Sequence, residues 1–236
     1  MSHDQMINEM IAGLRNASTT ERKAMAMANF PTRLEMLGTR APDLKAIAKN
    51  WRNKLPELSP EQWTELCLEL SKQPIFESQQ LAYELLWTNK KALKNLTAGQ
   101  VVELGQTLDN WASVDSYSTM IAGWHWREGT LGDEQIQQWM ASEDRWMRRT
   151  ALVCTVPLNL RAKGGTGDTR RTLMVCEQLI DDRDDMVIKA LSWALRELSK
   201  SDRQAVVDFM AKHVNLIHTR VRREVTTKLT TGKKNG

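Results

Sequence analysis

Residues 186–195 read Met186-Val-Ile-Lys-Ala-Leu-Ser-Trp-Ala-Leu195, and this stretch decides the fold class. Residues 77–86 and 145–154 share its order of a polar residue, a small or apolar pair and an aliphatic run. In all three stretches the apolar residues recur at the spacing of one helix face. Arg149 and Lys189 hold equivalent places 40 residues apart. A period of about 40 residues with two helices per unit is typical of HEAT and armadillo repeats, so we expect stacked helix pairs.

The rest of the chain agrees with an all-helical fold. It lacks alternating Val/Ile/Thr runs and Asn-Gly or Asp-Gly hairpin turns, so no strand is predicted. Hydroxyl side chains such as those of Ser59 and Thr97 precede several periodic segments and are typical helix caps. We predict an all-α fold, an α-solenoid of HEAT-like helical repeats with a concave face. It should form a single domain over residues 1–236, with residues 231–236 as a disordered tail.

Residues 157–168 are predicted to be a flexible, non-helical connector. They contain Lys163-Gly-Gly-Thr-Gly167, which lacks the Gly-Lys-Ser/Thr ending of a phosphate-binding loop and follows no strand.

Composition excludes several classes of protein. The chain is 41% hydrophobic and 26% charged, as in ordinary soluble proteins. It has neither an apolar run of about 18 residues nor a secretory signal, so we expect a cytoplasmic protein without a membrane partner. Its three cysteines are far apart, and it contains no His-Glu-x-x-His or Cys-x-x-Cys motif. We therefore expect buried thiols, no metal and no cofactor. Nothing in the sequence signals an oligomer, so a monomer is expected.

Charge is distributed unevenly along the chain. Residues 1–144 hold 14 basic and 19 acidic residues, a net charge of −5, and residues 145–236 hold 19 and 10, a net charge of +9. A basic half is expected when one surface faces a polyanion. The alternative is solvated charge that serves no partner.

The segment 185–200 places one tryptophan outside the expected core. At about 100° per residue, Trp193 falls opposite the apolar stripe, with the cations Lys189, Arg196 and Lys200 beside it. Cations bind phosphates, and an indole stacks on bases or packs on sugars. This face is therefore typical of a nucleic-acid surface. The alternative is that another repeat covers Trp193 and the cations extend around it.

Trp111 and Asp115 form a second candidate site. They lie four residues apart, so in a helix they share one face. An electron-rich ring beside a negative charge suits a planar cation, or a transition state that becomes positive. The alternative is a helix start with a buried Trp111 and an Asp115 that caps the helix or is solvated.

Four motifs together resemble the AlkD-type DNA alkylation repair glycosylases, over about residues 30–230. They are Leu-Gly-x-x-x-Pro at 37–42, Trp-x-Ser-Val-Asp-Ser at 111–116, Trp-x-x-Arg at 146–149 and Ile-Lys-Ala-x-x-Trp-x-Leu-Arg-Glu at 188–197. Some members carry a second tryptophan just before the one that matches Trp111, where this chain has Asn110.

This resemblance implies hydrolysis of the N-glycosidic bond of cationic alkylated purines, of the 3-methyladenine and 7-methylguanine type, during base excision repair. The partner is double-stranded DNA held on the concave face, without extrusion of the base into a pocket. Asp115 matches the catalytic carboxylate, Trp111 and Trp193 match the indoles that line the lesion, and Arg149 matches a group near its phosphates. The cations expected to contact the DNA backbone are Lys189, Arg196, Lys200 and Arg148.

Two alternatives remain open from the sequence. A non-catalytic HEAT-like module that binds nucleic acid or protein shares the scaffold and the basic half but has no need of Asp115. A pure protein scaffold has no need of salt-sensitive DNA binding at all.

Overall fold

The computed structural model describes residues 1–233. Over this range the chain forms helices joined by short turns, with two isolated β-bridges and no strand. The prediction of an all-α fold is therefore confirmed. The chain divides into two compact units, Met1–Ile121 and Ala122–Gly236. The single domain over 1–236 stays a prediction.

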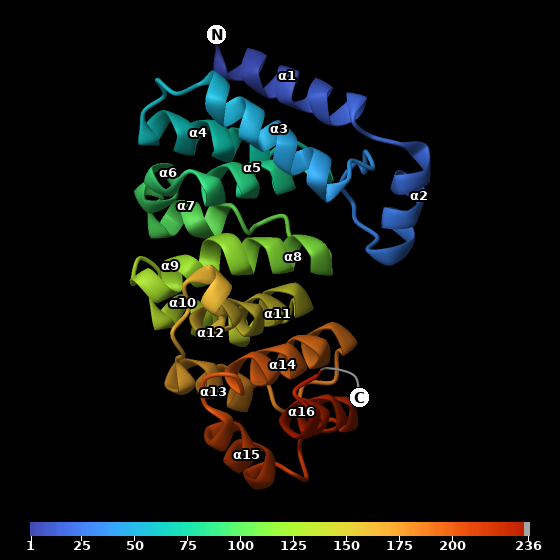
Figure 1. Ribbon diagram of the computed structural model, residues 1–236, viewed down its shortest axis with the longest axis vertical. Coiled ribbons are helices and arrows are strands. Elements are labelled where there is room, and N and C mark those ends of the chain that lie inside the picture. Colours follow the sequence, from blue (N-terminus) through green and yellow to red (C-terminus); the bar gives the residue numbers. More distant parts are fainter. Residues whose placement is uncertain (234–236) are drawn as a thin grey trace. The chain divides into compact units, whose positions relative to one another are not determined.

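The first unit stacks its helices in pairs, as an α-solenoid does (Figure 1). Helices α4 and α5 pack against each other, and Leu66 and Leu70 of α4 and Leu81 of α5 are fully buried. The hydroxyls of Ser59 and Thr97 accept from the first-turn amides of α4 and α7, each at 3.3 Å, which confirms the two predicted caps. The helices of this unit are α1 (His3–Asn16), α2 (Thr20–Asn29), α3 (Ala41–Lys54), α4 (Pro60–Ser71), α5 (Phe76–Thr88), α6 (Lys90–Asn95), α7 (Ala98–Glu103) and α8 (Trp111–Tyr117).

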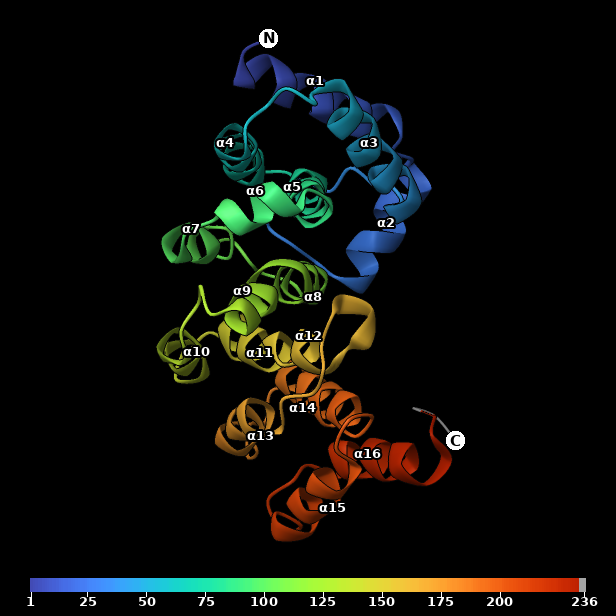
Figure 2. The same cartoon turned by 60° about the vertical axis from the view of Figure 1, so that its left-hand side comes forward.

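Helix α2 differs from its neighbours because it buries none of its residues. It lies at the side of the first unit away from α4, as Figures 1 and 2 both show. Gly38 fixes the start of this helix. Its φ is +96°, and a Cβ there would lie 2.5 Å from the Lys23 amide nitrogen, so only glycine allows the two backbones to approach so closely.

The second unit repeats the pairing of helices. A π-helix, Ser118–Ala122, follows α8. Helices α11 and α14 then pack face to face, and α16 covers α14. The elements of this unit are α9 (Gly123–Glu128), α10 (Asp133–Met140), α11 (Arg145–Cys154), α12 (Val156–Asn159), α13 (Thr169–Gln178), α14 (Asp185–Leu198), α15 (Arg203–Lys212) and α16 (Thr219–Thr231).

The three stretches that predicted the fold are all helical. Residues 77–86 lie within α5, residues 145–154 coincide with α11, and residues 186–195 lie within α14. The three cysteines are buried, as expected. Burial raises the pKa of the Cys67 and Cys176 thiols, so both stay protonated and pack as small apolar groups.

Two local expectations need correction. Residues 157–163 are not an irregular connector, because α12 continues to Asn159 and a 3₁₀ turn spans Arg161–Lys163. The Arg127 guanidinium holds this segment by donating to the carbonyls of Pro157 (3.2 Å) and Lys163 (2.8 Å), a contact that no local pattern reveals. At the C-terminus, α16 includes Thr231, and residues 234–236 of the predicted tail lie outside the described range.

Candidate functional site

Helix α8 carries the Trp111–Asp115 pair of the first unit. Asn110 caps this helix: its side-chain oxygen accepts from the Ser113 amide at 2.9 Å, and the residue is only 1% exposed. The helix therefore begins at Trp111, and Asp115 follows one turn later on the same face. Asp115 is half-buried. A tryptophan at position 110 would lose this cap, which explains why a small amide side chain occupies the position.

Trp111 is both exposed and anchored. Its side chain is on the surface, at 37% exposure, but its indole N–H donates to the Asn29 carbonyl at 3.0 Å. The Phe30 ring meets the indole edge to face, with centroids 5.5 Å apart and an interplanar angle of 80°. The expected alternative of a buried Trp111 is therefore wrong. No sequence pattern identifies Asn29 or Phe30 as neighbours of Trp111, since they lie more than 80 residues earlier in the chain.

Asp109 completes the attachment of the segment after α2. Its carboxylate accepts from the Thr32 hydroxyl at 2.7 Å, the Arg33 amide at 2.6 Å and the Asn110 side chain at 2.9 Å. Burial opposes ionisation of this carboxyl, but these hydrogen bonds outweigh burial and hold its pKa below the ordinary value. The residues at the start of α8 therefore hold the end of α2 in place. Asp109 was not among the residues that the sequence singled out.

Trp193 lies on α14 in the second unit. Most of this helix is buried, including Val187, Leu191 and Leu195, whereas Trp193 is only half-buried. The predicted position of this ring outside the core stripe is confirmed. Within residues 1–233 its indole N–H donates no hydrogen bond, in contrast to that of Trp111.

Each cation expected beside Trp193 has an acidic partner in the second unit. Lys189 pairs with Asp185 at 2.7 Å and Lys200 with Glu197 at 2.7 Å. Arg196 lies 3.8 Å from Glu224. Burial lowers the pKa of Arg196 in spite of its acidic neighbours. The net positive charge around Trp193 is therefore smaller than the three cations alone suggest.

Arg149 and Arg148 lie on α11 and are largely inside the protein. Arg149 is 5% exposed and donates to the Met186 carbonyl at 2.5 Å, which links α11 to the start of α14. The Arg148 guanidinium pairs with Asp182 at 2.6 Å. It also donates to the carbonyls of Ser142 and Glu143. Arg148 thus holds the turn before α11.

Other arginines of the second unit are exposed. Arg183, Arg222 and Arg223 form no side-chain hydrogen bond or ion pair with any residue that the structure describes. They were not among the predicted site residues, although a helical projection of 219–231 places Arg222 and Arg223 away from the buried Val221 and Val225.

The structure thus brings the predicted residues together in two groups. Trp111 and Asp115 share α8 in the first unit, and Trp193, Arg149 and their basic neighbours share α11 and α14 in the second. Over residues 1–233 there is no cluster of three His, Cys, Asp or Glu side chains with the geometry to hold a metal ion. No described helix has the length and apolar character that crossing a membrane requires.

Two comparisons with known proteins point to DNA alkylation repair enzymes, and each covers most of the chain. The model of a family described as "DNA alkylation repair enzyme" matches residues 10–229. A solved structure described as a predicted DNA alkylation repair enzyme from Enterococcus faecalis is similar with a TM-score of 0.72 and 19% sequence identity, over 91% of this chain and 97% of that one. At that identity the likeness establishes the fold alone. No curated protein matches this chain.

Proposed function

This chain belongs to the DNA alkylation repair enzyme family, and from that premise we propose that it is a monofunctional DNA glycosylase. Its substrates are cationic alkylated purines in duplex DNA, of the 3-methyladenine and 7-methylguanine type. It acts as a monomer and needs neither a metal nor a cofactor. The observation that carries the proposal is Asp115, a half-buried carboxylate one helical turn from the exposed indole of Trp111.

The chemistry suits a carboxylate beside an aromatic ring. N-alkylation gives the purine a positive charge, so the base leaves with the glycosidic electron pair and needs little help from a general acid. The sugar then acquires positive charge at C1′. The Asp115 carboxylate stabilises that charge and accepts a proton from the water whose oxygen attacks C1′.

The two indoles account for selectivity in this proposal. The faces of Trp111 and Trp193 attract a cationic base and the C–H groups of its sugar, at about 0.5–2 kcal/mol for each ring. A neutral purine gains less from these contacts and is a poorer leaving group. Arg149 contributes positive charge near the lesion's phosphates. Selection thus follows the charge of the base more than its shape.

DNA contacts in the second unit need a refined assignment. The four cations predicted to contact the phosphate backbone do so only in competition with acidic partners; they are Lys189, Arg196, Lys200 and Arg148. The exposed Arg183, Arg222 and Arg223 carry no such cost, so we add them to the proposed set.

Release of methylated purine from methylated duplex DNA tests the proposal. We expect release by the wild type and a loss of about 100-fold or more in Asp115→Asn, which keeps the shape of the side chain but not its charge. Asp208→Asn, an exposed carboxylate on α15, is the matched control and should keep full activity. Salt-sensitive DNA binding by the wild type without any base release would instead favour the non-catalytic module.

A further inference from the structure

A pocket of about 300 Å³ lies within the first unit, between α2, α3, α5 and the residues that follow Asp115. Such a volume is at the lower end for small-molecule sites and suits a ligand of the size of a fused-ring base. Its walls are largely apolar. They are formed by Met25, Phe30, Met36, Leu44, Phe76 and Met120.

Two carboxylates of α5 line this pocket and differ in their hydrogen bonding. Glu77 is satisfied by the protein, because it accepts from the backbone amides of residues 37, 38 and 39 at 2.9, 2.6 and 3.2 Å. Glu84 lies two turns further along α5 and is only 9% exposed. Among the described residues, none donates a hydrogen bond to the Glu84 carboxylate or forms an ion pair with it. No described protein group satisfies this carboxylate, so it is suited to a ligand that supplies the donors.

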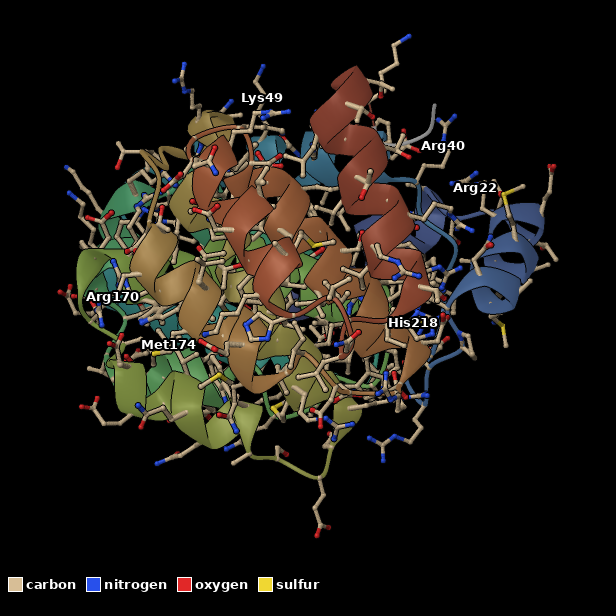
Figure 3. The ribbon with its side chains drawn as sticks, turned by 90° about the horizontal axis from the view of Figure 1, so that it is seen from below. Arg22, Arg40, Lys49, Arg170, Met174 and His218 are labelled. Atoms are coloured by element: carbon tan, nitrogen blue, oxygen red, sulfur yellow. The ribbon has the colours of Figure 1, made fainter. Side chains whose placement is uncertain are left out.

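Further polar groups stand around Glu84. The Ser116 hydroxyl lines the pocket directly after Asp115, and it too makes no hydrogen bond within the described range. Lys45 of α3, which is exposed, also lines the pocket, and no described carboxylate pairs with its ammonium group. Arg22, exposed on α2, is a further lining residue, and Figure 3 labels it on that helix. The pocket thus offers an acceptor pair, a hydroxyl and cationic donors around an apolar space.

We propose that this pocket binds a free purine base that presents two adjacent N–H donors. Guanine and 7-methylguanine present such an edge at N1 and the exocyclic amine, and a carboxylate accepts both donors at once. Glu84 accepts from that edge, and the Ser116 hydroxyl and Lys45 ammonium serve the acceptors of the base. The rings of Phe30 and Phe76, with centroids 5.2 Å apart, supply aromatic surface for the base. The inference rests on the proposed function in that the hydrolysis releases such a base as its product.

Occupancy has a consequence for α2. Met25 and Ala26 form the outer wall of the pocket, on a helix that buries none of its own residues. A base in the pocket gives these side chains an apolar partner. Binding should therefore slow hydrogen exchange of the α2 amides.

Calorimetric titration of the intact protein with 7-methylguanine, in the absence of DNA, tests the inference. We expect saturable binding to the wild type. In Glu84→Gln the affinity should fall about tenfold or more, because the side-chain NH2 group faces an N–H of the base where the carboxylate had an acceptor oxygen. Glu65→Gln, an exposed residue of α4 outside the pocket, is the matched control and should bind as the wild type does. Adenine should bind more weakly, because an acceptor stands beside its amino group.

A second variant keeps the test decisive if Glu84→Gln does not fold. Ala26→Trp fills the pocket from α2, where the wild-type helix buries nothing, so it should fold and lose binding. No binding of 7-methylguanine to the wild type, or equal binding by Glu84→Gln or Ala26→Trp, would overturn the inference. The titration uses no DNA, and the glycosylase assay measures only release from DNA, so the two proposals fail separately.

Discussion

The two indoles proposed to face the lesion are held in different ways. Trp111 of the first unit donates its N–H to Asn29 and meets Phe30 edge to face, so it supports the end of α2 as well as presenting a ring. Trp193 of the second unit is half-buried, and its N–H has no acceptor among the described residues. Removing Trp111 therefore disturbs structure and site together. Removing Trp193 is the cleaner measurement of what a ring contributes to function.

The largest loss of folding stability should come from removing Trp111, and it should exceed the loss from removing Trp193. Trp111→Ala loses a hydrogen bond, an aromatic contact and part of its buried surface, so we expect a loss of about 2 kcal/mol in the free energy of unfolding. Trp193→Ala should cost about 1 kcal/mol or less, because it leaves no acceptor unsatisfied. Urea unfolding measures the loss, and hydrogen exchange locates it. Equal losses, or unchanged exchange of α2 amides in Trp111→Ala, would contradict the comparison.

An intermediate loss of stability should follow from replacing Asp109, whose carboxylate holds the segment after α2 by accepting from Thr32 and Arg33. Its folded-state pKa is lower than in the unfolded chain, so its contribution is complete above the unfolded pKa of about 3.9 and disappears as the pH falls through the folded value. At pH 7, Asp109→Asn should lose about 1–2 kcal/mol of stability.

The difference in the free energy of unfolding between the wild type and Asp109→Asn should stay constant down to about pH 5 and then shrink as the pH is lowered toward about 2, in urea unfolding at each pH. Asp202→Asn is a control in the second unit, because its pKa is lowered too, by hydrogen bonds from Thr169 and the Ala205 amide. That variant should leave hydrogen exchange of α2 unchanged. A constant difference across the pH range would mean that Asp109 does not act through its charge.

The smallest effect on folding should come from the exposed arginines of the second unit. Replacing Arg222 and Arg223 together by alanine should change stability by less than about 0.5 kcal/mol, since neither pairs with a described residue. If both contact phosphates, the slope of log affinity against log salt should fall by about 1.8. An unchanged slope in the double variant would remove these arginines from the DNA surface.

Sequence reasoning succeeded where the determinants are local. Periodicity located α5, α11 and α14, hydroxyl caps located the starts of α4 and α7, and the projection of α14 placed Trp193 outside the core. The pairs Asp185–Lys189 and Glu197–Lys200 are also local, at spacings of four and three residues, and were available from the sequence. These acidic partners lower the net charge of the face around Trp193.

Sequence reasoning failed where the partner is distant in the chain. The Trp111 indole bonds to a carbonyl 82 residues away, and Arg196 meets an acid from α16. Backbone carbonyls carry no side-chain signature, so no composition or spacing identifies Asn29 as an acceptor. The same holds for the guanidinium of Arg127 that orders residues 157–163.

The hydrogen bond from Trp111 to Asn29 also makes α2 and the ring face thermodynamically linked. A ligand that takes the indole N–H for itself removes one of the few attachments of α2, so its apparent affinity includes the free energy of releasing that helix. The coupling is reciprocal. If a ligand on the Trp111 face changes the affinity of α2 for a second ligand by some factor, that second ligand changes the affinity of the Trp111 face by the same factor. The Trp111 face of α8 is thus energetically coupled to α2, a helix that buries none of its own residues.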